Sequence, residues 1–252
     1  MKLAYDRIGV GYGTRRRSDP RIAKSLLRAL GDAGSVLNVG AGAGSYEPVD
    51  RLVIAVEPSA TMIGQRPEGA AACVQALAEQ LPFADERFDA AMGILTVHHW
   101  TRMTVGLSEL RRVARKRIVL LTWDPQCDEQ FWLTRDYLPE VLEFDRVRFP
   151  KLSVLEQHLG PLEVSTLLIP ADCADGFRGS YWKRPSAYLE PGVQRSISSF
   201  TALDPAVAAR FTAQLAADLA SGEWARRNAE LEECEARDIG YRIVTASCSF
   251  ER

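Results

Sequence analysis

Three glycines at alternate positions, followed by a carboxylate, form the pattern with the clearest chemical meaning in this chain. Gly40, Gly42 and Gly44 follow an apolar run, and Glu57 ends the next apolar run, 53–56. Glycine allows a sharp turn and a close approach of the backbone to a ligand. A carboxylate at the end of the next strand can accept both hydrogen bonds of a ribose diol. The pattern is typical of a nucleotide-binding strand–helix–strand unit.

Two further expected strands also end beside side chains that can do chemistry. The strand expected at 88–95 is followed by His98 and His99, and the one expected at 117–122 by Asp124. Ligands of parallel sheets bind at the carboxyl ends of the strands, so these three side chains are the candidate catalytic residues. For each, a general-base role stands beside a cofactor contact and a purely structural role. No metal site is expected, because the side chains of adjacent histidines point apart.

The elements that must position these residues follow from hydrophobic periodicity. Asp19 and Pro20 are typical of a helix start, and apolar residues on one face predict a helix that ends at Gly31. A helix is also expected after the glycine loop. Strands are expected at 36–39, 53–56, 71–74, 88–95, 117–122, 163–169 and 239–247. The alternation predicts an α/β fold: a doubly wound, mostly parallel, seven-stranded, Rossmann-like sheet with helices on both faces.

Composition limits the class of protein. With 252 residues, 46% of them hydrophobic and 25% charged, the chain can bury one substantial core. A net charge of −2 gives no general attraction to nucleic acids. No apolar run approaches the roughly 18 residues of a membrane span, and no signal-peptide pattern is seen, so a cytoplasmic protein without a membrane partner is expected. The five cysteines are scattered without a CxxC pair, which favours reduced thiols.

Four short segments carry a family resemblance. They are NVGAGAG at 38–44, VEPS at 56–59, AEQLPF at 78–83 and FD at 88–89. In combination they resemble the successive motifs of class I S-adenosylmethionine-dependent methyltransferases, most closely the small-molecule branch that includes ubiquinone and menaquinone biosynthesis enzymes. The resemblance covers roughly residues 1–125. It implies S-adenosyl-L-methionine as cofactor and methyl transfer to an O, N or C atom of a small-molecule acceptor.

The same resemblance assigns residues to parts of the cofactor. The glycine loop would lie under the methionine part, Glu57 would hold the ribose and Met62 would cover the adenine. Ala78 and Glu79 would lie at the adenine edge, and Leu95 near the methionine. The full set of implied cofactor residues is Tyr12, Asn38, Gly40, Ala41, Gly42, Gly44, Glu57, Pro58, Met62, Ala78, Glu79, Leu95 and His98.

Two positions depart from the family pattern, and two other functions stay open. The first motif position, usually acidic, is Asn38, which weakens charge pairing with the cofactor's ammonium group. Leu77 stands where Asp is common, so adenine recognition is expected to rely on backbone groups. One alternative is a non-catalytic, methyltransferase-like module that binds a partner protein. The other is an NAD-binding oxidoreductase, because residues 40–45 nearly match GxGxx(G/A).

A long segment before the last strand is the most individual feature of the chain. About 70 residues separate the sixth and seventh expected strands, where a minimal methyltransferase of this family has a tight connection. One long helix is expected from Asp204 to about Glu230. The expected organisation is a cofactor-binding domain of residues 1–170 plus 239–252 and a helical insertion, 171–238.

We expect this insertion to pack over the carboxyl edge of the sheet as a lid. Aromatic side chains and the cations Arg178, Lys183 and Arg184 would suit a planar or anionic acceptor. Two alternatives remain: the aromatic residues form the insertion's own core, or the insertion is a dimer interface, so that the protein is a monomer or a homodimer. The candidate acceptor-binding residues are Tyr5, Trp123, Tyr181, Trp182 and Arg184.

Overall fold

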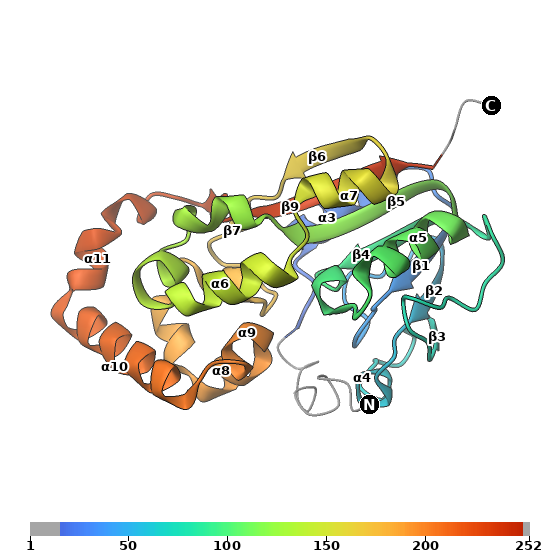
Figure 1. The fold of residues 1–252 in the computed structure, drawn as a ribbon. Helices are drawn as coiled ribbons and strands as arrows, with labels where there is room; N and C mark the ends of the chain where they lie inside the picture. The colour runs from blue at the N-terminus through green and yellow to red at the C-terminus, as the bar shows by residue number, and fades with distance from the viewer. Residues whose placement is uncertain (1–15, 249–252) are drawn as a thin grey trace.

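The computed structural model describes residues 16–248, without the side chains of 128–130. Its main feature is a seven-stranded sheet in the order β3-β2-β1-β4-β5-β9-β6 (Figure 1). The strands are β1 Ser35–Val39, β2 Leu52–Val56, β3 Ala72–Val74, β4 Phe88–Ile94, β5 Ala114–Trp123, β6 Leu162–Thr166 and β9 Tyr241–Ser247. Neighbouring strands from β3 to β5 pair in parallel, and β9 runs antiparallel between β5 and β6. The predicted Rossmann-like α/β fold is confirmed.

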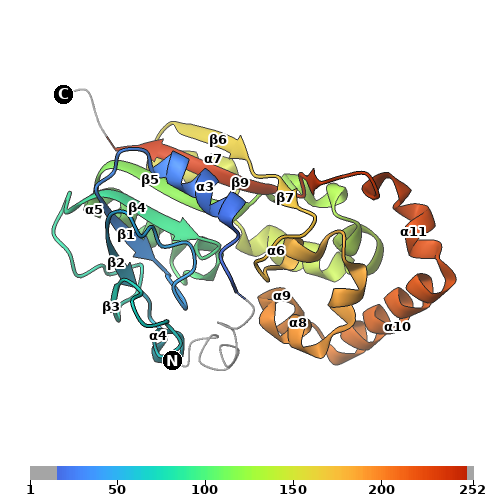
Figure 2. The same ribbon diagram turned by 180° about the vertical axis from the view of Figure 1, so that it is seen from behind.

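Helices cover both faces of this sheet. α3 (Pro20–Leu30) lies on one face, and α5 (Met103–Val113) and α7 (Leu152–Leu159) lie on the other (Figures 1 and 2). Successive side chains of a strand point to opposite faces, so Val119 of β5 packs in the α3 layer and Leu120 in the layer of α5 and α7. Within residues 16–248 no helix combines the length and apolarity that a bilayer crossing requires.

The helix expected between β1 and β2 is absent. Residues 40–51 form turns instead. Gly40, Gly42, Gly44 and Tyr46 have φ values of 69°, 55°, 93° and 63°. Positive φ at these four positions interrupts right-handed helical backbone, so the glycine loop passes to β2 as an irregular connection.

The long segment before β9 begins and ends at a two-stranded sheet. β7 (Ile169–Pro170) pairs antiparallel with β8 (Ala236–Arg237), and these strands enclose residues 171–235. The prediction of a single long helix is wrong, because the segment forms two helices, α10 (Pro205–Ser221) and α11 (Glu223–Arg227). Gly222 between them has a φ of 78°, which ends α10. The other α-helices of this segment are α8 Pro191–Ser196 and α9 Ser198–Thr201, and three short 3-10 helices accompany them.

A second segment, residues 125–150, packs with this insertion, which the sequence did not suggest. It contains α6 (Pro139–Arg148), which lies on the same side of the molecule as α8–α11 in both views (Figures 1 and 2). Trp132 Nε1 donates to the Trp182 carbonyl oxygen at 2.8 Å, and the Tyr137 hydroxyl donates to Asp218 Oδ2 at 2.7 Å. We call residues 125–150 and 171–235 together the helical cap.

Candidate active site

A cleft of about 1110 Å³, measured to its open mouth, lies at the carboxyl ends of β1, β2 and β4. Ten of the residues expected at the cofactor line it. They are Asn38, Gly40, Ala41, Gly42, Glu57, Pro58, Met62, Ala78, Glu79 and Leu95. The other lining residues, which include the candidate catalytic residue His99, are Arg16, Ala43, Ser45, Ser59, Leu77, Ile94, Thr96, His99, Trp100, Thr101 and Arg148. We call this cleft the first cavity.

The glycine loop forms the floor of the first cavity where side chains would not fit. A Cβ at Gly40 would lie 1.9 Å from Thr96 Oγ1, and one at Gly42 would lie 3.3 Å from Met62 Cε. Both residues also have positive φ, which disfavours any residue with a side chain. Gly44 does not line the cavity. A glycine at this position allows the positive φ of 93° that the turn requires.

Glu57 holds the loop and faces the cleft. Its Oε2 accepts a hydrogen bond from the Gly42 backbone N–H at 2.8 Å, and its Oε1 accepts one from the Ser59 backbone N–H at 2.9 Å. A carboxylate can accept about four hydrogen bonds. Because Glu57 also lines the first cavity, its carboxylate is of the kind that can accept from the two hydroxyl donors of a ribose.

Asn38 offers a second acceptor at the first cavity. Its Nδ2 donates to Glu47 Oε1 at 3.1 Å, and Glu47 is held by a buried ion pair with Arg66 at 2.7 Å. The Glu47 contact orients the amide, and Asn38 Oδ1 is left buried without a hydrogen-bond partner. An unsatisfied buried acceptor costs about 1–3 kcal/mol, so a bound ammonium group that donates there would stabilise the site.

The two histidines differ in position. His99 lines the first cavity, and its Nδ1 lies 2.8 Å from Nη2 of Arg148. His98 does not line that cavity, and its ring stacks on Phe149 with centroids 3.9 Å apart. Burial, and then the nearby Arg148 charge, lower the pKa of His99 to about 3. Burial, and then His99, hold the pKa of His98 well below its usual value. Both rings are therefore neutral and weakly basic.

A second cavity of about 500 Å³ adjoins the first, between the sheet edge and the helical cap. The two cavities share the wall residues Arg16, Leu95 and His99. The other lining residues of the second cavity are His98, Asp145, Phe149, Phe177, Arg178, Ser196, Ile197, Ser198, Ser199 and Tyr241. The insertion thus contributes to this wall through Arg178, one of the cations expected from the sequence, but not through Lys183 or Arg184.

The expected roles of Asp124 and Trp123 do not fit the geometry. Asp124 Oδ1 accepts a hydrogen bond from the Gln126 backbone N–H at 3.0 Å, and Asp124 lines neither cavity. Its carboxylate begins a short 3-10 helix, Pro125–Gln130. Trp123 is 1% exposed, and its Nε1 donates to the Ile239 carbonyl oxygen at 2.9 Å. Both side chains are structural.

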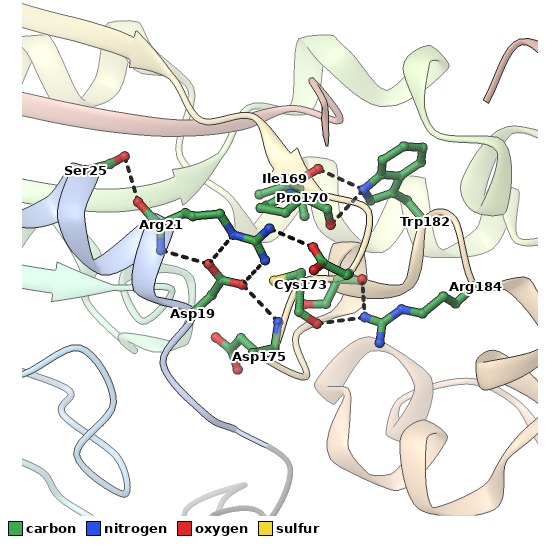
Figure 3. Close-up of polar contacts among 12 residues, drawn as sticks. Asp19, Arg21, Ser25, Ile169, Pro170, Cys173, Asp175, Trp182 and Arg184 are labelled. Carbon is green, nitrogen blue, oxygen red and sulfur yellow. Dashed lines mark hydrogen bonds and ion pairs between the residues drawn. The ribbon is translucent and has the colours of Figure 1, made fainter. Parts of the chain in front are cut away.

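The expected aromatic wall of the insertion is also wrong. Trp182 is fully buried, and its Nε1 donates to the carbonyl oxygen of Ile169 at 2.9 Å (Figure 3). Arg184 Nη2 donates to the carbonyl oxygen of Cys173 at 2.8 Å, and its guanidinium lies over the Tyr181 ring. None of Tyr181, Trp182 and Arg184 lines either cavity. Tyr181 and Trp182 pack in the insertion's own core, the alternative that the sequence left open, whereas Arg184 is exposed.

The segment that precedes α3 is tied to the cap at Asp175. Arg16 Nε donates to Asp175 Oδ1 at 2.6 Å, and the Tyr46 hydroxyl donates to Asp175 Oδ2 at 2.9 Å. Next to it, Asp19 Oδ2 accepts from the Ala174 backbone N–H at 3.0 Å (Figure 3). Three parts of the chain thus meet beside the site. The expected Tyr5 and Tyr12 lie outside the described residues.

Comparison with known proteins identifies the family. A family profile described as "Methyltransferase domain" matches residues 37–121. The chain is 32% identical to a candidate methyltransferase from an antibiotic biosynthesis pathway of Anabaena variabilis, with a TM-score of 0.84 over 93% of this chain and 99% of that one. No curated protein gives a match. The fold and cleft are those of a class I methyltransferase. The chain belongs to the S-adenosylmethionine-dependent methyltransferases.

More distant structures share the fold. A candidate methyltransferase from Bacillus halodurans is 17% identical, with a TM-score of 0.53 over 90% of this chain and 99% of that one. A Thermotoga maritima methyltransferase, described as a candidate histamine N-methyltransferase, is 15% identical, with a TM-score of 0.51 over 91% and 90%. These matches do not single out the ubiquinone and menaquinone branch. Family membership does not support the NAD-binding alternative.

Proposed function

We propose that the first cavity binds S-adenosyl-L-methionine, that the second binds a small-molecule acceptor, and that methyl transfer to an O, N or C atom takes place where they meet. The observation that supports this most is the shared wall. Arg16, Leu95 and His99 line both cavities. The two cavities are therefore neighbours, so a cofactor in one and an acceptor in the other would lie on either side of these three side chains, and transfer requires a passage past them.

The residues of the first cavity suit the cofactor in kind and position. Glu57 would accept from the ribose hydroxyls, and the orphan Oδ1 of Asn38 would accept from the ammonium group. Gly40 and Gly42 would let the backbone lie against the methionine part. When bound, the cofactor supplies a methyl group that its sulfonium already activates.

The contribution of the chain to the reaction would be orientation and the exclusion of water. Holding two reactants in a productive geometry can supply a large part of a rate enhancement. His98 and His99 are weak bases, because burial and neighbouring cations lower their pKa values. We therefore assign them a positioning role at the junction, and an acceptor that must lose a proton would lose it elsewhere.

The helical cap would act as the lid over the acceptor. Phe149 comes from the segment before β6, and Phe177 and Ile197 come from the insertion; all three line the second cavity. The relative from Anabaena variabilis is assigned by name to an antibiotic biosynthesis pathway, which favours a small-molecule acceptor for this chain too.

Calorimetry and mass spectrometry test the proposal. S-adenosylmethionine and S-adenosylhomocysteine should each bind at one site, and NAD should not. Incubation with methyl-labelled cofactor and a metabolite extract should then give a labelled small molecule. Binding of NAD without either sulfur compound would refute the cofactor assignment, and label found only on protein or nucleic acid would refute the acceptor assignment.

A further inference from the structure

The second cavity has a buried arginine in its wall. Arg178 comes from the insertion, its side chain is 7% exposed, and it forms an ion pair with Asp145 of α6, which also lines the cavity. Its guanidinium lies 5.1 Å from the centroid of the Trp123 ring, and its Nε–H has no hydrogen-bond partner. An arginine taken out of water keeps its charge, so the cavity presents a cation with unused donor capacity.

A third arginine lies where the two cavities adjoin. Arg178 is paired with Asp145, and Arg16 is paired with Asp175. Arg148 lines the first cavity, contacts the shared residue His99 and forms no ion pair with any carboxylate in the described part of the chain. A negatively charged ligand near this junction would balance the charge of Arg148.

The remaining wall combines aromatic rings with the hydroxyl groups of Tyr241, Ser196, Ser198 and Ser199. The rings of His98, Phe149, Phe177 and Tyr241 all line the cavity. The Tyr241 hydroxyl accepts from the Gly179 backbone N–H at 3.2 Å, and no acceptor takes its own proton within residues 16–248. Burial raises the pKa of Tyr241 to about 12, so this hydroxyl remains a donor at neutral pH. Aromatic walls favour a flat ring between them.

We propose that the acceptor is a small aromatic carboxylic acid, whose carboxylate is bound by Arg178 and the Tyr241 hydroxyl while its ring lies among the aromatic walls. This rests on the proposed function, because it names the class of substrate for the acceptor cavity. A neutral compound of the same shape would leave the charge of Arg148, where the two cavities adjoin, unbalanced.

The test compares an acid with its neutral amide. Benzoate and benzamide, and likewise cinnamate and cinnamamide, are titrated calorimetrically into the protein saturated with S-adenosylhomocysteine. We expect each acid to bind at least about tenfold more tightly than its amide, as expected for a charge-assisted hydrogen bond. Equal binding of acid and amide, or binding of neither while S-adenosylhomocysteine binds, would overturn the acid proposal and leave the proposed function standing. Failure of S-adenosylhomocysteine to bind would overturn both.

Paired variants locate the selectivity. Arg178→Gln combined with Asp145→Asn removes both charges of the pair, so that neither is left buried alone. The control is Arg210→Gln with Glu140→Gln, a similar pair on the outer surface of the cap whose side chains are 48% and 38% exposed. The acid preference should disappear in the first variant and persist in the control.

A single substitution guards against loss of folding in the double variant. Arg148→Gln removes the charge beside the junction of the two cavities without breaking an ion pair within residues 16–248, and we expect the acid preference to fall severalfold. A preference unchanged in either the folded double variant or Arg148→Gln would contradict the role of these charges.

Discussion

The Arg148 guanidinium donates a hydrogen bond to Nδ1 of His99 at 2.8 Å, where the last residue of α6 meets the loop after β4. Arginine has only donors, so His99 Nδ1 must accept and its Nε2 must carry the proton. This contact joins the helical cap to the ligand edge of the sheet. It also makes protonation of His99 unfavourable, which gives a measurable pH dependence.

We predict that His99 destabilises the fold in mild acid. Its pKa is lowered from 6.5 to about 3, so between these values the unfolded chain binds a proton that the folded chain does not. Stability should therefore fall as pH decreases from about 6.5, by up to about 1.4 kcal/mol per pH unit. Urea unfolding of wild type and His99→Asn between pH 7 and about pH 5 measures this, and the variant should show the shallower dependence.

Carboxylates whose pKa is lowered do not change the stability of the fold within this pH range. The pKa of Asp19, hydrogen-bonded to Arg21, and that of Asp89, hydrogen-bonded to Arg115, are lowered from 3.8. Their contributions are thus present above about pH 4 and are lost only below it. If the free energy of unfolding changes with pH equally in wild type and in His99→Asn above pH 5, His99 is not held neutral by its surroundings.

Gly42→Ala should abolish cofactor binding with only a modest loss of stability. The new Cβ would lie 3.3 Å from Met62 Cε on the floor of the first cavity, at a φ of 55°. Gly69→Ala is the matched control, because its φ is 82° but no atom lies within 4 Å of the added Cβ. Each should lose about 1–2 kcal/mol from the strained φ, measured by chemical denaturation. Equal affinity of both variants for S-adenosylhomocysteine would show that the loop does not touch the cofactor.

Glu57→Gln should weaken S-adenosylhomocysteine binding by about 1.5–3 kcal/mol for each charge-assisted hydrogen bond lost to the ribose. In the variant, the side-chain amide also places an N–H donor, where the carboxylate had an acceptor, against the backbone N–H of Gly42 or Ser59. The comparison is Glu109→Gln, which removes a carboxylate that accepts from the Leu81 N–H outside the cavity. If calorimetry gives the two variants the same affinity for S-adenosylhomocysteine, Glu57 does not bind the ribose.

Asp175→Asn should loosen the segment before α3, because it removes the charge that pairs with Arg16 and accepts from Tyr46. Trypsin should then cleave after Arg16 or Arg17 several times faster than in wild type, as followed by mass spectrometry. The control is Asp172→Asn in the same loop, because the Asp172 carboxylate is 80% exposed and pairs with Arg21. Trypsin should cleave this control variant at the wild-type rate. Faster cleavage of both variants would indicate general loosening of the loop.

The features that could be predicted from the sequence are those fixed by local patterns. The N-cap at Asp19 and the meeting of the glycine loop with Glu57 depend on residues close in sequence, and the structure has both, although the helix expected after the loop is absent. The aromatic residues of the insertion were misjudged because periodicity cannot say whether Trp182 faces a ligand or a core. Likewise, nothing local to Arg178 indicated that Asp145, 33 residues earlier, would pair with it beside the second cavity.

A crystal structure with S-adenosylhomocysteine tests the central claim most directly. The account predicts the ribose hydroxyls at Glu57, the amino group within hydrogen-bond distance of Asn38 Oδ1, and the sulfur beside Leu95 and His99, facing the second cavity. The nearest side chain of the insertion should lie within about 15 Å of the sulfur, roughly the reach of a ligand-sized pocket. A sulfur turned away from the second cavity, or an insertion well beyond that distance, would contradict the assignment of the two cavities to cofactor and acceptor.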